Sequence, residues 1–218
     1  MTGRNATLIS TVRLARGFSG ILVLLASITG CHFLPVAAAQ PVADQTTAGR
    51  NAPFRRLELR AGVAQNLSQD PILDLWSPGP SFSFDASTPF YFGTIGAGFR
   101  FERFSGRSAG RPSFNSLLTS LRWGFHWSQW AVEHEMGVEI GSFFMAFEED
   151  TFAGARRESE LALGAYYRIQ LPLTERAGLF VRGAYTGVRT RRRMDFFHVT
   201  TGIVIKAGMP TWLRSLLE

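Results

Sequence analysis

A histidine and a hydroxyl-bearing residue lie two positions apart near the end of the chain, in the segment Phe197-His198-Val199-Thr200. Residues two apart in an extended strand point to the same face, so His198 could take the proton of the Thr200 hydroxyl group and make it a nucleophile. That chemistry needs a separation of about 3 Å and a carboxylate that orients the histidine. No acidic residue follows until Glu218. His198 and Thr200 are therefore catalytic candidates for which the sequence supplies no third member.

A larger set of ionisable residues recurs at alternate positions of strand-like segments and shares its face with glycines. A charge enclosed by protein must be paired or hydrated, because an isolated buried ion is very costly. We therefore expect these side chains, together with Glu58 and Arg60, to form ion pairs inside the fold. The predicted network consists of Arg100, Glu102, Arg122, Glu133, Glu135, Glu139, Arg168 and Arg182.

A third group of candidates consists of arginines in the connections between these segments. The formal net charge is +6, and Lys206 is the single lysine. The arginines are scattered, and no long basic helix or known nucleic-acid motif accompanies them, so we expect no nucleic-acid partner. Guanidinium groups pair well with phosphate groups. The sequence predicts an anion-binding rim, with a solvated basic surface as the alternative, at Arg107, Arg111, Arg156, Arg157, Arg189, Arg191, Arg192 and Arg193.

No metal or cofactor site is predicted. Cys31 is the single cysteine, and no pair of histidines has the helical spacing of metal ligands. Gly93, Gly96 and Gly98 lie within a strand-like segment, where glycine allows close packing or curvature, rather than in a phosphate-binding loop.

The elements that must position these residues have a period of two, in which apolar residues alternate with charged, polar or glycine residues. Seven such segments are long, and Ser81-Phe82-Ser83-Phe84-Asp85 is a shorter eighth. We expect the first two strands over 55–66 and 80–86. The connections are expected at 87–89, 105–113, 128–130, 148–156, 172–176 and 189–193. Shorter and longer connections alternate, which favours an up-and-down barrel with an even number of strands.

A soluble β-sandwich or a lipocalin-like barrel would also alternate. Two features favour a barrel that spans a membrane. Several segments are longer than the usual strand of about five or six residues. Their polar faces hold glycines and charges, whereas a small soluble barrel fills its interior with apolar side chains. If the apolar face meets lipid, aromatic residues near strand ends are expected to form interfacial girdles: Phe90, Phe92, Phe104, Trp123, Trp127, Trp130, Phe143 and Phe144.

The chain begins with a predicted secretory leader over residues 1–39. A basic start, an apolar stretch and Ala37-Ala38-Ala39 indicate cleavage after Ala39. Ile28-Thr29-Gly30-Cys31 resembles a lipoprotein signal and leaves lipidation at Cys31 open, and an uncleaved membrane anchor is a third alternative. Residues 40–54 are expected to be a flexible mature N-terminus.

The barrel is assigned to residues 55–207 and is followed by a periplasmic tail over 208–218. Trp212, Leu213, Leu216 and Leu217 would share one face of a short helix in this tail. We expect that amphipathic helix to lie on the membrane surface.

Residues 55–207, with the leader, the alternating strands and the alternating connections, resemble the broad class of small eight-stranded outer-membrane β-barrel proteins. The resemblance implies an all-β, antiparallel, up-and-down transmembrane barrel in the bacterial outer membrane. It also implies outer-membrane lipid and lipopolysaccharide as partners, and the barrel-assembly machinery during insertion. The arginine rim would then face lipopolysaccharide.

Within that class, structural, adhesive, pore-like and lipid-modifying roles all occur, and the fold does not choose between them. Our first hypothesis is a non-enzymatic barrel that supports the envelope or binds a surface ligand. Two alternatives stay open. One is a lipid A-modifying hydrolase, because the deacylase type of small barrel uses a His-x-Ser pair near its last strands, where this chain has His198 and Thr200. The other is a small-solute channel.

Overall fold

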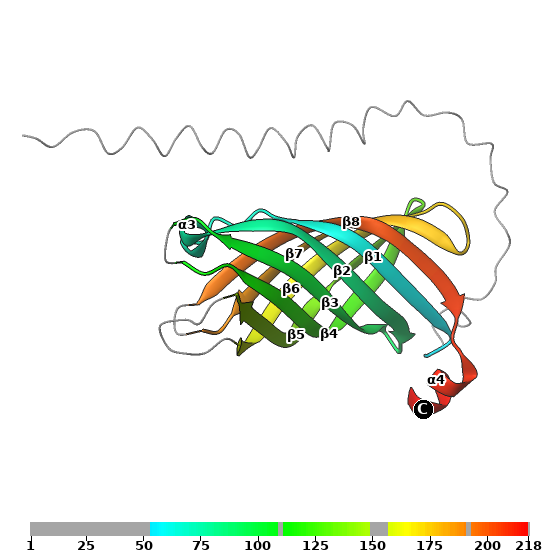
Figure 1. Cartoon of the computed structure of the whole chain (residues 1–218). Coiled ribbons are helices and arrows are strands. Elements are labelled where there is room, and N and C mark those ends of the chain that lie inside the picture. The colour runs from blue at the N-terminus through cyan, green and yellow to red at the C-terminus, as the bar shows by residue number, and fades with distance from the viewer. Residues whose placement is uncertain (1–52, 109–110, 149–156, 191–192, 218) are drawn as a thin grey trace, which may run out of the picture. The chain divides into compact units, whose positions relative to one another are not determined.

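The computed structural model of the chain describes residues 53–108, 111–148, 157–190 and 193–217 (Figure 1). The predicted leader, with Ala39 and Cys31, and most of the predicted mature N-terminus lie outside the described residues. Eight antiparallel strands pair in sequence order, and the last pairs with the first, so the sheet is a closed barrel. The strands are β1 (Arg56–Asn66), β2 (Trp76–Phe90), β3 (Gly93–Gly106), β4 (Phe114–Gln129), β5 (Val132–Phe147), β6 (Arg157–Pro172), β7 (Ala177–Val188) and β8 (Met194–Gly208).

Alternation along each strand sends apolar side chains outward and polar side chains inward. In β4, Leu121, Trp123 and Phe125 are exposed on the outside, while Ser120 and Gly124 are buried inside. The other strands add further exposed apolar residues, among them Val63, Phe82, Phe99, Val138, Ile140, Leu163, Ile169, Leu179, Ile203 and Ile205. A barrel with an apolar exterior and a polar interior is arranged for lipid, since closure satisfies every backbone hydrogen bond within the sheet. The predicted fold class is confirmed: the chain is an antiparallel, up-and-down transmembrane β-barrel of eight strands.

The connections fall into two groups at opposite ends of the barrel. Two two-residue turns (91–92 and 130–131) and the link 173–176 lie at the end where β1 begins and β8 finishes, which we call the turn end. Segment 67–75 lies at the other end, the loop end, where β3, β5 and β7 finish and β4, β6 and β8 begin. Helix α3 (Ile72–Leu75) belongs to this segment, and helix α4 (Thr211–Leu217) follows β8. No helix among the described residues is long and apolar enough to cross a membrane.

Strand β2 is longer than expected, and the turn that follows it lies elsewhere. It runs over 76–90 rather than 80–86, so the connection expected at 87–89 is part of the strand and the turn lies at 91–92. Pro78 and Pro80 suggest a loop in the sequence, but the pairing with β3 continues through this region with a register shift between Pro78 and Ser81. A local irregularity of this kind accommodates prolines that a regular ladder would exclude.

The interior has two chemically different layers. At the loop end, nine apolar side chains pack together inside the barrel and form what we call the apolar plug: Phe104, Phe114, Leu118, Phe143, Met145, Ala162, Val188, Met194 and Phe196. The rings of Phe104 and Phe114 stack with centroids 4.7 Å apart. Ile72 and Leu73 of α3 pack against the plug. The prediction that Phe104 and Phe143 belong to an interfacial girdle is therefore wrong, because both side chains fill the lumen.

Candidate functional site

Between the apolar plug and the turn end, the lumen holds a neutral network of ionised side chains. The strands bring six basic and six acidic groups inside: Arg60, Arg100, Arg122, Arg168, Arg182 and Lys206, with Glu58, Asp85, Glu102, Glu133, Glu135 and Glu139. Their inward direction follows from the period of two, because each occupies the face opposite the lipid-facing residues. The charges balance, so the network requires no further ion to neutralise it.

Asp85 of β2 is the acidic centre of this network. Its carboxylate oxygens lie 3.1 Å from Nη1 of Arg60, 3.0 Å from Nη1 of Arg122 and 3.7 Å from Nη1 of Arg168. The Asp85 side chain is 4% exposed. One carboxylate thus links guanidinium groups from three strands across the interior.

Glu135 and Glu139 of β5 extend the network toward β6 and β7. Glu135 accepts hydrogen bonds from the Tyr166 hydroxyl group at 2.6 Å and from Arg168. Glu139 accepts from Arg182 and, at 3.0 Å, from the Thr186 hydroxyl group. Each oxygen of both carboxylates therefore accepts a hydrogen bond, from β6 in the case of Glu135 and from β7 in the case of Glu139.

Glu58 and Glu133 lie nearer the turn end and are paired as well. Glu58 pairs with Arg60 and Arg56, and Glu133 lies 2.6 Å from the ammonium group of Lys206. The ion pairs therefore continue through the lumen to this end of the barrel.

The catalytic candidates lie inside the barrel, next to the apolar plug. His198 is 1% exposed and donates a hydrogen bond from Nε2 to Oε2 of Glu102 at 2.9 Å. Thr200 is 3% exposed, and within the described part of the chain no hydrogen bond joins it to His198. His198 therefore has a carboxylate partner that the sequence did not indicate, and that partner lies across the lumen. Because the imidazole ring of His198 is enclosed by the barrel, a lipid on the outer surface does not reach it.

All eight side chains of the predicted charge network lie in the lumen. Asp85 is the important member that sequence reasoning missed, since its strand gave the least regular pattern. A signal was nevertheless present: Phe82 and Phe84 face outward, so Asp85, one position further along the strand, faces the lumen.

The described members of the predicted arginine rim lie at the loop end. Arg107, Arg111, Arg157, Arg189 and Arg193 are exposed there, whereas Arg156, Arg191 and Arg192 lie outside the described residues. Two exposed arginines of this end are held by carboxylates: Arg103 lies 2.7 Å from Glu148, and Arg193 lies 2.9 Å from Asp195. The hydrogen bond that Arg193 donates to the carboxylate of Asp195 raises the pKa of Arg193 above its ordinary value.

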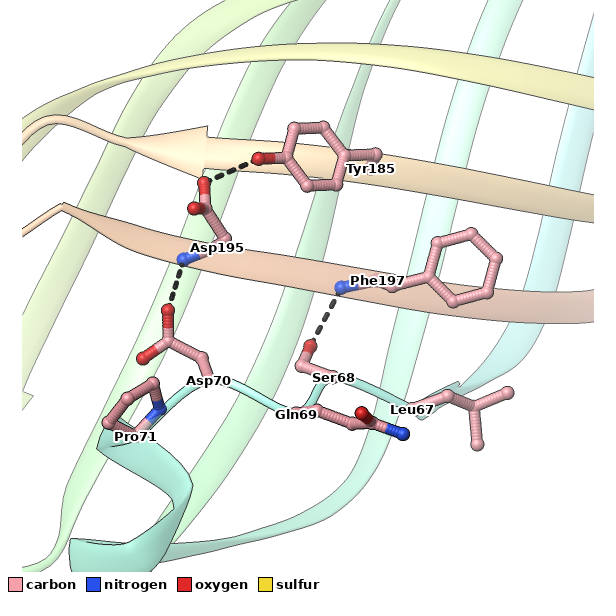
Figure 2. Close-up of a pocket in the computed structure, with 8 residues that line it drawn as sticks. All are labelled: Leu67, Ser68, Gln69, Asp70, Pro71, Tyr185, Asp195 and Phe197. Atoms are coloured by element: carbon pink, nitrogen blue, oxygen red, sulfur yellow. Dashed lines mark hydrogen bonds between the residues drawn. The ribbon is translucent and has the colours of Figure 1, made fainter. Parts of the chain in front are cut away.

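Several polar groups that line a surface pocket at the loop end are hydrogen-bonded to one another and to the backbone. Figure 2 shows the segment 67–71 lying beside the beginning of β8. Asp70 accepts a bond from the backbone of Asp195 at 2.8 Å, and Ser68 accepts one from the backbone of Phe197 at 2.7 Å. The carboxylate of Asp195 accepts a hydrogen bond from the Tyr185 hydroxyl group at 2.6 Å. These polar groups tie the first loop to the barrel.

A closed ring of eight antiparallel strands, lipid-facing outside and filled by ion pairs and apolar side chains inside, defines the class of small transmembrane β-barrels. The chain has the fold of a small eight-stranded outer-membrane β-barrel protein, as the sequence predicted. No protein-family model matches it, and no curated protein matches it.

Several solved structures have a similar fold. Neisserial surface protein A is similar with a TM-score of 0.47 and 11% identity, over 69% of this chain and 95% of that one. The Yersinia pestis outer membrane protein Ail in a phospholipid bilayer nanodisc is similar with a TM-score of 0.48 and 13% identity, over 70% and 99%. The outer membrane protein OprG from Pseudomonas aeruginosa is similar with a TM-score of 0.48 and 11% identity, over 72% and 98%. At such identities the likeness concerns the fold alone.

Proposed function

We propose that this protein is a non-enzymatic barrel of the bacterial outer membrane whose loop-end arginines bind the phosphate groups of lipopolysaccharide. The observation that carries the proposal is the position of these arginines. They are exposed at the end of the barrel just beyond the lipid-facing residues, where an outer-membrane barrel meets phosphorylated glycolipid.

The filled lumen supports a structural role. Its charges balance and are mostly paired, and the apolar plug covers the network on the loop side. A small-solute channel would need a hydrated path through both layers. The inward position of His198 likewise supports a role in the interior over catalysis on lipid.

The free guanidinium groups support phosphate binding. Within the described residues, Arg107, Arg157 and Arg189 make no ion pair, in contrast to Arg103 and Arg193. A guanidinium group that no carboxylate holds can offer its paired N–H groups to a phosphate.

The test compares two double variants at the same end of the barrel. The change Arg107→Gln with Arg189→Gln removes two free guanidinium groups, and Arg103→Gln with Arg193→Gln removes two that are already paired. We expect the first pair to weaken lipopolysaccharide binding by about tenfold, which corresponds to about 1.4 kcal/mol, and the second pair to weaken it less. Binding is measured by titration of the barrel in detergent. Equal losses in both variants, or unchanged binding of dephosphorylated lipopolysaccharide, would contradict the proposal.

A further inference from the structure

A pocket opens on the outer side of the barrel at the loop end, where segment 67–75 lies against β8 (Figure 2). Its walls are residues 67–71 and three strand residues, Tyr185, Asp195 and Phe197. Tyr185 and Phe197 belong to the exposed outer face of β7 and β8, so the pocket does not open into the lumen. Its volume is about 490 Å³, within the range of about 300–1,000 Å³ that is typical of small-ligand sites.

The walls of the pocket are held together by hydrogen bonds that involve the backbone. The N–H group of Leu67 donates to the carbonyl oxygen of Phe197 at 2.8 Å. One carboxylate oxygen of Asp70 accepts from the N–H group of Ile72 and the other accepts from that of Asp195, both at 2.8 Å. Because the segment is already fixed to β8, a ligand does not have to order it, which removes part of the entropic cost of binding.

Two polar side chains in the pocket keep free hydrogen-bonding capacity. The bonds from Tyr185 and Arg193 to the carboxylate of Asp195 both go to Oδ1. Oδ2 accepts none from the described residues, and the Asp195 side chain is 38% exposed. Gln69 is exposed, and its side-chain amide makes no hydrogen bond within the described part of the chain. An amide has both donors and an acceptor, so the pocket offers groups of both kinds to a ligand.

The remaining walls of the pocket are apolar. Leu67, Pro71 and Phe197 lie beside the polar groups, and Phe197 is 41% exposed. Binding sites of this composition use a few polar groups to orient a ligand that also buries apolar surface. A pyranose ring has both features, because its hydroxyl groups project from its rim and its axial C–H bonds form an apolar face.

The charges of the wall disfavour an anion or a metal ion. Asp70 and Asp195 contribute two carboxylates, against the single guanidinium group of Arg193 beside them. Like charges brought together in this way would repel a phosphate group. Among the residues that the structure describes, no group of three or more His, Cys, Asp or Glu side chains could hold a metal ion. A neutral ligand with hydroxyl groups suits the wall better, since hydrogen bonds to a carboxylate are strong.

We propose that this pocket binds a neutral sugar ring, whose hydroxyl groups bond to Asp195 Oδ2 and to the Gln69 amide while its C–H face packs on Phe197. The inference rests on the proposed function for the source of the sugar. Arg193 of the predicted rim bonds to Asp195, so the pocket adjoins the arginines that bind the phosphates of lipopolysaccharide. The rim and the pocket then hold different parts of one glycolipid. A free saccharide has the same chemistry, and the test separates the two sources.

The first measurement follows the pocket by NMR of the isotope-labelled barrel in a detergent that contains no sugar. The probes are lipopolysaccharide, the same lipopolysaccharide after dephosphorylation, and its dephosphorylated core saccharide after release from the lipid. We expect the side-chain amide signals of Gln69 to shift in a saturable way with both forms of the glycolipid. A shift with the free saccharide as well would show that the sugar alone is sufficient, whereas no shift would assign the site to lipid-linked sugar.

The second measurement compares variants in their affinity for dephosphorylated lipopolysaccharide. Gln69→Ala removes the amide and leaves the bonds that hold the segment to β8. We expect it to weaken binding about fivefold, the effect of one lost hydrogen bond. Asp195→Asn removes the charge that strengthens the other bond and is expected to weaken binding at least as much. The matched control is Asp74→Asn, which removes an exposed carboxylate of α3 outside the pocket and should leave the affinity unchanged.

The failure of the pocket and the failure of the proposed function give different results. Unshifted Gln69 signals with every probe, or equal affinities of Gln69→Ala, Asp74→Asn and the unaltered barrel, would overturn the sugar site. If Arg107→Gln with Arg189→Gln still weakens binding of intact lipopolysaccharide, the proposed function stands without it. The same shifts with calcium chloride alone, and none with sugar, would also overturn the proposal and identify a cation site. Dependence on Gln69 without dependence on the arginines would support the pocket and contradict the rim.

Discussion

Asp85 lies among Arg60, Arg122 and Arg168, and its energetic importance follows from that position. Each arginine would be a costly buried cation without a nearby carboxylate. The attraction between the partners is strong because their side chains are almost fully removed from water. The pairing therefore compensates a penalty that the fold itself creates by enclosing these groups.

We expect Asp85→Asn to destabilise the barrel by about 3–5 kcal/mol, because it leaves buried guanidinium groups without their shared partner. The free energy of unfolding is measured by urea titration of the barrel in lipid or detergent. The matched control is Glu148→Gln, which removes the exposed partner of Arg103 and is expected to change the stability by less than about 1 kcal/mol. Similar effects of the two substitutions would contradict a special role for Asp85.

Much of the charged interior could be predicted from residue order alone. Arg122, Glu139 and Arg168 occupy the face opposite obvious lipid-facing residues, so their direction follows from alternation. Their partners could not be predicted, because pairing across a lumen depends on barrel closure and register. The bond between His198 and Glu102 is an example: the two residues lie on β8 and β3, and no local pattern connects them.

At the scale of elements, the pairing of β1 with β8 depends on two glycines that face each other, Gly62 and Gly202. A Cβ atom on Gly202 would lie 2.1 Å from the carbonyl oxygen of Ala61 and 2.6 Å from the Cα of Gly62. Both contacts are with backbone atoms, so no side-chain rotation relieves them. The strands approach so closely here that a side chain at this position would push them apart.

We expect Gly202→Val to impair closure of the barrel. The readout is electrophoretic mobility before and after heating, since a closed barrel migrates differently from the unfolded chain. The neighbouring change Thr201→Val places the same side chain on the exposed outer face and should leave mobility unaltered. A heat-modifiable band of normal intensity for Gly202→Val would show that the strands tolerate the side chain.

The sequence predicted the long strands well and the apolar plug poorly. Alternation identifies two faces, but an apolar layer inside the lumen has the same composition as the exterior. The alternation within each strand does show which apolar side chains face inward. Phe104 is two residues from Glu102, and Phe196 is two residues from His198, so each shares the inner face with a polar residue. The end of β2 was misplaced because its serines and prolines give little contrast between the faces.

At the scale of the whole molecule, the two layers of the lumen predict that the barrel does not conduct ions. The network occupies the space toward the turn end, and the apolar plug fills the loop end. Eight strands leave an interior that side chains can fill. We expect no conductance steps when the purified protein is inserted into planar bilayers, with insertion verified by protease protection. Regular, protein-dependent steps would contradict a filled lumen.

The pairing of Arg56 with Gly208 brings together the first and last strands of the barrel. No earlier pairing can replace it, so the ring stays open until β8 is available to pair with β1. Throughout that interval the backbone hydrogen-bonding groups at one edge of β1 are unpaired, and the apolar faces of the other strands are exposed to water. Such a state is prone to aggregation. The delay before β8 can pair, rather than the stability of the finished barrel, therefore sets how long the open chain is exposed to aggregation.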